Sequence, residues 1–208
     1  MILRAVTLHD TGGTTLLTLQ ARDNDTNAET PTRNTEGVQP PASNIQGAFG
    51  DGLHKVGVLE RDFALCNVSG YDSIYHAKAA LDTALSQTAS IRVSGWELPI
   101  ASVQGVTEWQ HLLVGLRARV RFVPRSAFWR YLTDTKSGQA GQGPSSDVVV
   151  IGNGISLVAT DVGRLFVWAD GMEARIITVD GHSQATVNIS QTVTFQNVTL
   201  YTAAAGLL

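Results

Sequence analysis

Apolar residues between positions 70 and 87 recur at the spacing of one helix face. This stripe consists of Ile74, Ala77, Leu81, Ala84 and Leu85. Polar residues such as Lys78 and Asp82 fall outside it. Ser69 is a good N-cap, and Asp72 follows three residues later, where a carboxylate meets the positive end of the helix dipole. The pattern predicts an amphipathic helix over 70–87 that packs on another element.

A second element, over residues 112–123, alternates strictly between two kinds of side chain. One face consists of Leu112, Val114, Leu116, Ala118, Val120 and Phe122. The other face carries Arg117, Arg119 and Arg121. A helix would scatter these arginines around its axis, so the period of two predicts a strand. We expect one face of this strand to belong to the core and the other to require anions.

Acidic partners for the arginine row occur in the strand pattern of residues 54–68. If that strand neighbours residues 112–123, Glu60 and Asp62 share a face and lie across from Arg119 or Arg121. Each good cross-strand pair would then contribute about 0.2–1 kcal/mol. Alternatively, the row contacts an acidic surface on a neighbouring subunit. The sequence leaves both interpretations open, and on the second one Arg117 and the four residues just named are candidate interface residues.

Two tryptophans flank a stretch that is typical of a hairpin arm. A short apolar strand over 90–95 leads to Trp96, and residues 103–109 end at Trp109. Pro99 lies between them and cannot donate to a strand ladder, which indicates an edge or an excursion. Trp96 and Trp109 belong either to the core or to the aromatic anchors of a subunit interface.

The N-terminal third combines a hairpin with a long polar stretch. Residues 2–8 and 14–19 are predicted strands, joined by a turn over 10–13 with two glycines. Residues 21–52 are rich in polar residues, and Pro31, Pro40 and Pro41 exclude a continuous ladder. Such a loop either orders against a partner or is a solvated excursion.

The pattern of the C-terminal third predicts a series of strands after a polar segment. Residues 134–146 are rich in glycine and lack an apolar anchor, which predicts a linker between a first domain, 1–133, and a second region, 147–208. Short strands are expected over 147–151, 155–160, 162–168, 173–179, 185–189 and 192–201. They form either a β-meander or strands that complete the first sheet.

Composition favours a β-rich protein with surface to bury. The chain has 208 residues and 20 glycines, and 16% of its residues are charged, against a usual fraction of about 25%. Surface of this kind is often buried in an assembly. The net charge of −3 lacks the basic footprint of a DNA-binding domain. The first seventy residues are acidic overall, and residues 92–130 are basic.

No set of residues with catalytic spacing occurs in the sequence. The five histidines lie far apart, and the single cysteine, Cys66, excludes an intrachain disulfide and a cysteine-based zinc site. We therefore expect no enzyme activity, cofactor or metal. The N-terminus lacks a signal-peptide pattern and no apolar run reaches the length of a membrane span, which predicts synthesis in the cytoplasm without a membrane anchor.

A carbohydrate- or ligand-binding β-sandwich is a rival interpretation. Trp168 and Tyr201, together with asparagines and aspartates in turns, could form a face on which sugars stack. Trp168 also alternates with Phe166 and Arg164, a pattern that a core-facing strand gives equally well.

The order of elements resembles the distal tail proteins of long-tailed bacteriophages and the related tail-tube proteins. The resemblance is carried by the helix that begins Gly70-Tyr-Asp-Ser-Ile-Tyr-His-Ala-Lys-Ala-Ala-Leu, by Ile91-Arg-Val, and by Arg117-Ala-Arg-Val-Arg-Phe-Val-Pro124 followed by Phe128-Trp129. It covers roughly residues 50–131. The resemblance implies a β-sandwich with one flanking α-helix and a long β-hairpin, plus C-terminal β-strands.

The same resemblance implies a function in a virion. Six copies would close into a ring that joins the tail tube to the baseplate or tip, contacts other tail proteins and encloses a lumen for DNA. The low charge of the chain suits such a lumen, because cationic walls bind phosphate. The alternative within the resemblance is a tail-tube subunit. Larger members carry a galectin-like second domain, for which the region after residue 146 is too short.

Overall fold

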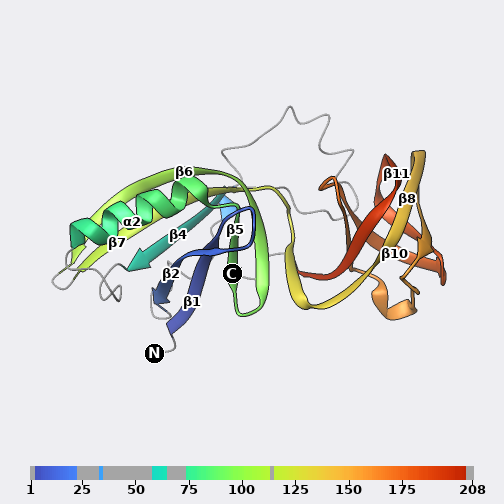
Figure 1. Ribbon diagram of the computed structural model, residues 1–208, viewed down its shortest axis with the longest axis horizontal. Coiled ribbons are helices and arrows are strands. Elements are labelled where there is room, and N and C mark those ends of the chain that lie inside the picture. Colours follow the sequence, from blue (N-terminus) through green and yellow to red (C-terminus); the bar gives the residue numbers. More distant parts are fainter. Residues whose placement is uncertain (1–2, 23–32, 35–57, 65–73, 113–114, 205–208) are drawn as a thin grey trace. The chain divides into compact units, whose positions relative to one another are not determined.

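A computed structural model describes residues 3–22, 33–34, 58–64, 74–112 and 115–204 (Figure 1). Most of the described residues lie in strands and one segment of them is an α-helix, so the prediction of a mainly β protein with one α-helix is confirmed. The chain divides into two compact units, each with its own hydrophobic core. The described residues of the first unit lie within 1–42 and 54–129, and those of the second within 130–204. Within the described ranges, no helix is long and apolar enough to cross a membrane.

The strands of the first unit pair in a closed cycle. They are β1 (Leu3–His9), β2 (Thr15–Arg22), β3 (Arg33–Asn34), β4 (Val58–Ala64), β5 (Ser90–Val93), β6 (Trp96–Leu112) and β7 (Gly115–Pro124). The antiparallel pairings run β1–β5–β6–β7–β4–β2 and return to β1, while β3 pairs with β4. The arginine strand therefore lies between β4 and β6.

The predicted N-terminal hairpin is present as β1 and β2. Asp10 Oδ1 accepts a hydrogen bond of 2.8 Å from the Thr14 backbone N–H, and the carbonyl of Asp10 accepts one of 3.1 Å from Gly13. Gly13 has a φ of +80°, a conformation that residues with a side chain rarely adopt. The turn over residues 10–13 that the sequence predicts is therefore the turn that closes the hairpin.

Strands β6 and β7 form the long hairpin of this unit. The pairing runs from Ile100 opposite Pro124 to Leu112 opposite Gly115, and its register shifts at three places along β6. Each shift inserts an extra residue, which bends and twists the hairpin. On β7, Ala118, Val120 and Phe122 are fully buried, so the predicted core face is confirmed for these residues. The strand expected over 112–123 is wrong at its start, because Leu112 ends β6 and β7 begins at Gly115.

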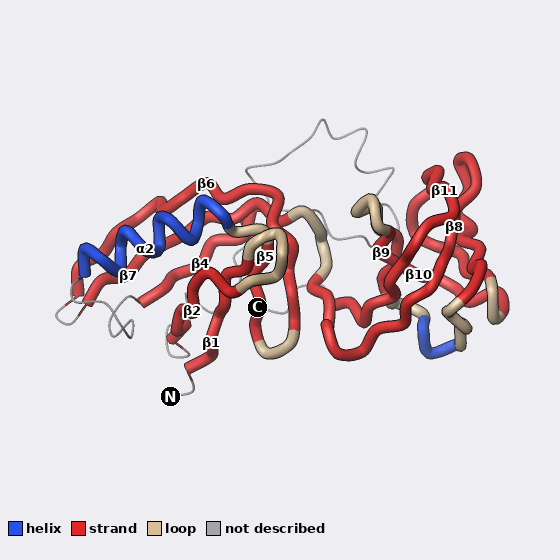
Figure 2. Tube along the Cα trace, in the orientation of Figure 1, coloured by secondary structure: helices blue, strands red, loops and turns tan. Residues whose placement is uncertain are grey.

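The predicted helix is α2, Ile74–Gln87. Its apolar face is buried at Ala77, Leu81, Ala84 and Leu85. It contacts β1, β2 and β6, and Figure 2 shows it running along the long hairpin. The expected cap residues Ser69 and Asp72 lie outside the described residues. The core beneath α2 includes the fully buried residues Leu8, Leu81, Val120 and Phe122.

The second unit is built from four strands and a short 3₁₀ turn. They are β8 (Trp129–Asn153), η2 (Ala159–Asp161), β9 (Leu165–Trp168), β10 (Glu173–Gly181) and β11 (Gln184–Ala204). Strands β9, β10 and β11 pair with one another in antiparallel fashion, and β11 also pairs with β8. Phe166, Trp168 and Leu200 lie at the centre of the core of this unit.

The linker expected over 134–146 is instead part of β8, and the second unit begins at residue 130. Two of its three glycines, Gly138 and Gly141, allow close approach of neighbouring atoms. A Cβ at Gly138 would lie 2.2 Å from the backbone oxygen of Asn153, and a Cβ at Gly141 would lie 2.8 Å from the ring of Phe195. The two ends of β8 therefore pack against each other, and Phe195 covers the backbone. The segment is as rich in glycine as a flexible linker, and for this reason its composition predicted a linker.

One of the short strands expected in this region is also wrong, and so is one break between strands. Residues 155–160 are not a strand, because the chain turns at η2, where buried Asp161 accepts a hydrogen bond from the Val158 N–H at 2.9 Å. The predicted break at residues 190–191 is absent, and β11 continues through it. The chain turns between β9 and β10, with Gly171 at a φ of +86°.

Candidate functional site

The arginine strand β7 pairs with β4 on one side and with β6 on the other. The register places Asp62 of β4 and Glu108 of β6 directly across from Arg119. Glu60 lies across from Arg121, whose other neighbour is Gly105. Arg117 lies across from Ala64 and Gln110. We call the surface formed by the side chains of Arg119, Arg121 and Glu108 the arginine face.

One ion pair of the arginine face is resolved in detail. Arg119 Nη1 lies 3.0 Å from Glu108 Oε2, and the two side chains are 42% and 56% exposed. An ion pair this exposed contributes about 0.2–1 kcal/mol or less to stability. The pair therefore has little effect on the free energy of unfolding. Its main effect is on the charge of the surface.

The sequence anticipated part of this arrangement. The predicted juxtaposition of Glu60 and Asp62 with the arginine row is confirmed by the pairing of β4 with β7. Glu108 was missed, because the bulge next to it hides the alternation of β6 in the sequence. The register places these positions next to one another along the strands, while a role of the same residues at a subunit interface stays a prediction.

The two tryptophans of the long hairpin pack against the core of the first unit. Trp96 and Trp109 are both half-buried there. The Lys78 ammonium of α2 lies 4.7 Å from the centre of the Trp109 ring, in cation–π geometry. Of the two roles that the sequence left open, packing onto the core is the one described for this chain.

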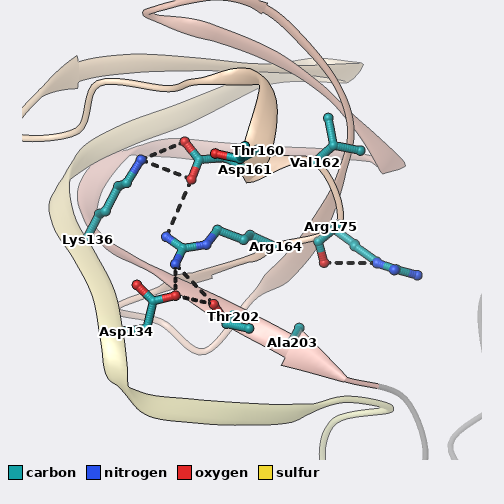
Figure 3. A pocket seen from close by; sticks show the side chains of 10 residues that line it. Asp134, Lys136, Thr160, Asp161, Val162, Arg164, Arg175, Thr202 and Ala203 are labelled. Carbon is teal, nitrogen blue, oxygen red and sulfur yellow. Dashed lines mark hydrogen bonds and ion pairs between the residues drawn. The ribbon is translucent and has the colours of Figure 1, made fainter.

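The second unit holds an open cavity of about 470 Å³ with a charged lining (Figure 3). Its charged residues are Asp134, Lys136, Asp161, Arg164 and Arg175. They come from the start of β8, from η2, from the entry to β9 and from β10. Thr160, Val162, Gly163, Thr202 and Ala203 complete the lining.

Asp161 is the buried centre of this cluster, with only 3% of its side chain exposed. Lys136 Nζ lies 2.7 and 2.9 Å from its two carboxylate oxygens, and Arg164 Nη1 lies 3.4 Å away. Because a buried carboxylate needs both charge compensation and hydrogen bonds, these contacts explain how Asp161 is accommodated.

Asp134 lies on the exposed side of the same cluster. It forms an ion pair with Arg164 and accepts a hydrogen bond of 2.6 Å from the Thr202 hydroxyl. The hydrogen bond from Arg164, followed by that from Thr202, holds the pKa of the Asp134 carboxyl below its ordinary value. Arg164 thus joins the two carboxylates.

The polar groups of the cluster are engaged with one another and with backbone carbonyls. Lys136 also donates to the carbonyl of Ser156, and Arg175 Nε donates to the carbonyl of Gly163, at 3.2 and 3.1 Å. Figure 3 shows the Arg175 guanidinium pointing away from Lys136 and Arg164. The carboxylates are engaged by cations and donors, which is unfavourable for general-base chemistry. The sequence could not reveal the cluster, because its members are joined only by long-range contacts.

The aromatic residues proposed for sugar stacking do not form a stacking face. Trp168 is 2% exposed, and its Nε1 donates to the carbonyl of Ala140 at 3.1 Å. Tyr201 is half-buried, with the Arg130 guanidinium 5.7 Å from its ring centre. Trp168 is therefore a core residue, and the rival interpretation loses the side chain on which it mainly depended.

Among the residues that the structure describes, no group of three or more His, Cys, Asp or Glu side chains is arranged to hold a metal ion. A scan against protein-family models finds no match, and neither curated proteins nor solved structures match the chain.

Proposed function

We propose that this protein is a structural component of a bacteriophage tail. In this proposal it is a distal tail protein that forms a ring of six copies, by analogy with the family it resembles, and connects the tail tube to the baseplate or tip. The lumen of the ring passes DNA, and the ring contacts other tail proteins. A tail-tube subunit is the alternative assignment within the same class.

The observation that carries the proposal is the architecture of the first unit. A single helix, α2, packs on a cycle of antiparallel strands that includes the long β6–β7 hairpin. This combination is what the resemblance to distal tail and tail-tube proteins led us to expect. The β-sandwich of that family remains part of the proposal.

The second unit supports a structural role by its chemistry. Its charged cluster ties β8, η2, β9 and β11 together through Asp161 and Arg164. The arginine face likewise pairs charges without presenting a nucleophile or a general base. We therefore propose a protein that acts by assembly and not by catalysis.

Light scattering on the size-exclusion peak of the purified chain, with negative-stain images of the same peak, tests the proposal. The expected result is a closed ring with about six times the 22.2 kDa mass of one chain, or tubes that grow with concentration. A chain that stays monomeric at high concentration, alone and when mixed with tail-tube protein of the same phage, would contradict the proposal.

A further inference from the structure

Asn153 and Gly154 form the single Asn-Gly pair of the sequence, at the point where β8 ends. Asparagine is a thermolabile residue, because the backbone nitrogen of the next residue can attack its side-chain amide. Of the eight asparagines, five precede threonine, isoleucine or valine, whose two heavy atoms on Cβ crowd that nitrogen. Gly154 has no Cβ, so its nitrogen is the least hindered of the eight.

The side-chain amide of Asn153 is open to water. The residue is exposed, and its Nδ2 donates to Oε1 of Gln139, which is also exposed, at 3.3 Å. This distance is longer than the usual N–H···O hydrogen bond, so the contact restrains the amide only weakly. Asn197 is exposed in the same unit, but Val198 follows it. The two asparagines therefore differ in the residue that would carry out the attack.

The fold requires glycine at position 154. Gly154 has a φ of +78°, which residues with a side chain rarely adopt. A Cβ at this position would also lie 2.7 Å from the backbone oxygen of Ser137 and 2.8 Å from Cα of Gly138. The close approach of the two ends of β8 thus places a residue without a Cβ directly after an exposed asparagine.

We propose that Asn153 is a site of spontaneous deamidation in the folded protein. The Gly154 backbone nitrogen gives its proton to hydroxide and attacks Cγ of Asn153. A bond forms between that nitrogen and Cγ, the bond between Cγ and Nδ2 breaks, and Nδ2 takes a proton from water and leaves as ammonia. The product is a five-membered cyclic imide in the main chain. This inference does not depend on the proposed function.

Water then opens the imide at either of its two carbonyls. Attack at Cγ gives aspartate, and the main chain keeps its path. Attack at the main-chain carbonyl gives isoaspartate, in which the chain runs through Cβ and Cγ and the former carbonyl becomes a free carboxylate. Either product has exchanged one amide nitrogen for an oxygen of water, and either one carries a new negative charge at neutral pH.

The two products have different consequences for β8. A Cβ on Gly138 would overlap the backbone oxygen of Asn153, so that oxygen lies directly against the Gly138 backbone. In isoaspartate the same oxygen belongs to a charged carboxylate, and the main chain is one carbon longer. Isoaspartate should therefore disrupt the contact between the two ends of β8, whereas aspartate should preserve it.

The first test follows deamidation in the purified full chain. The folded protein is incubated over a pH series, and digestion with mass spectrometry measures the conversion at each asparagine. We expect Asn153 to convert before every other asparagine, at a rate that rises in proportion to the hydroxide concentration. A protein isoaspartyl methyltransferase should label the same peptide. Asn197 is the internal control, and Asn153→Gln should abolish the conversion at this position.

The same incubation in urea separates local chemistry from the fold. If Asn153 converts in urea but stays intact in the folded chain, the fold protects the site and the proposal is overturned. It is overturned equally if Asn197 converts as fast as Asn153, or if Asn153 converts in neither condition.

The second test compares the two products. Asn153→Asp reproduces the aspartate product and should melt at the temperature of the wild type. The incubated wild type should contain a fraction that melts at a lower temperature, and this fraction should equal the fraction labelled by the methyltransferase. A labelled protein that melts as Asn153→Asp does would overturn the predicted effect on β8.

Discussion

Lys136 Nζ lies 2.7 Å from Oδ2 of Asp161, although 25 residues separate the two along the chain. Lys136 belongs to β8, and Asp161 is the last residue of η2. The contact joins a segment that resembles a linker in sequence to a turn that resembles a strand. The contact between Lys136 and Asp161 therefore helps to define the local structure of both β8 and η2.

Loss of the Asp161 carboxylate should destabilise the second unit strongly. Asp161→Ala leaves Lys136 and Arg164 without their buried counter-charge, which costs about 3–5 kcal/mol when one partner of a buried pair is removed. Urea denaturation with a probe in the second unit measures the effect. Asp180→Ala, at an exposed turn, is the control, and an equal loss in both variants would show that Asp161 is not the centre of a clamp.

Gly138 and Gly141 of β8 should not tolerate a side chain. Gly141→Ala forces a Cβ against the ring of Phe195, and overpacking of this kind costs about 1–3 kcal/mol. The loss should be partly recovered in the double variant Gly141→Ala/Phe195→Ala, because the ring that is contacted is gone.

Gly138→Ala provides the matched comparison. Its Cβ meets the backbone oxygen of Asn153, so Phe195→Ala should not rescue it. Thermal denaturation of the three single variants, Gly138→Ala, Gly141→Ala and Phe195→Ala, and of the two double variants measures both effects. Equal behaviour of Gly138 and Gly141 in this cycle would contradict the packing described for β8.

The two faces of β7 should differ sharply in their contribution to stability. Phe122→Ala empties a fully buried position and should lower the free energy of unfolding by about 3–5 kcal/mol. Arg119→Gln, three residues earlier on the exposed face, should change it by less than about 1 kcal/mol. Chemical denaturation measures both changes, provided that the free energy of unfolding depends equally steeply on denaturant concentration in the two variants. Comparable losses in the two variants would mean that the arginine face is not exposed to solvent.

Acid should weaken the turn that Asp170 closes. The Met172 backbone N–H, followed by the Gln196 side chain, lowers the pKa of the Asp170 carboxyl below 3.8. Because the folded-state pKa is below the unfolded value, ionised Asp170 contributes stability above that value, and the contribution is lost as the pH falls through the folded-state pKa.

The variant Asp170→Asn tests this dependence. It should be less stable than the wild type at neutral pH, and the difference should shrink as the pH falls below 3.8. Thermal denaturation over a pH series measures the difference, with Asp82→Asn on the exposed surface of α2 as the control. A difference that does not change with pH would show that the carboxylate charge has no part in the turn.

Local periodicity was sufficient for the elements that carry the proposed function. The helix stripe through Leu81 and Leu85 is fixed by spacing along the chain, and the alternation through Val120 and Arg121 is fixed in the same way. Both predictions are confirmed because side-chain direction in a helix or strand follows from backbone geometry alone. The partner strand of the arginine row was also anticipated, since Glu60 and Asp62 share the period of two.

Tertiary structure alone decided the rest. Glycine composition cannot distinguish a flexible linker from a strand that needs close backbone approach, and only the position of Asn153 against Gly138 separates the two. Likewise, Glu108 reaches Arg119 through a bulged register, and Asp161 reaches Lys136 and Arg164 only after distant segments have packed. Periodicity fixes which way a side chain points, because that depends on neighbouring dihedral angles. Which residue it meets depends on long-range pairing, which no local pattern encodes.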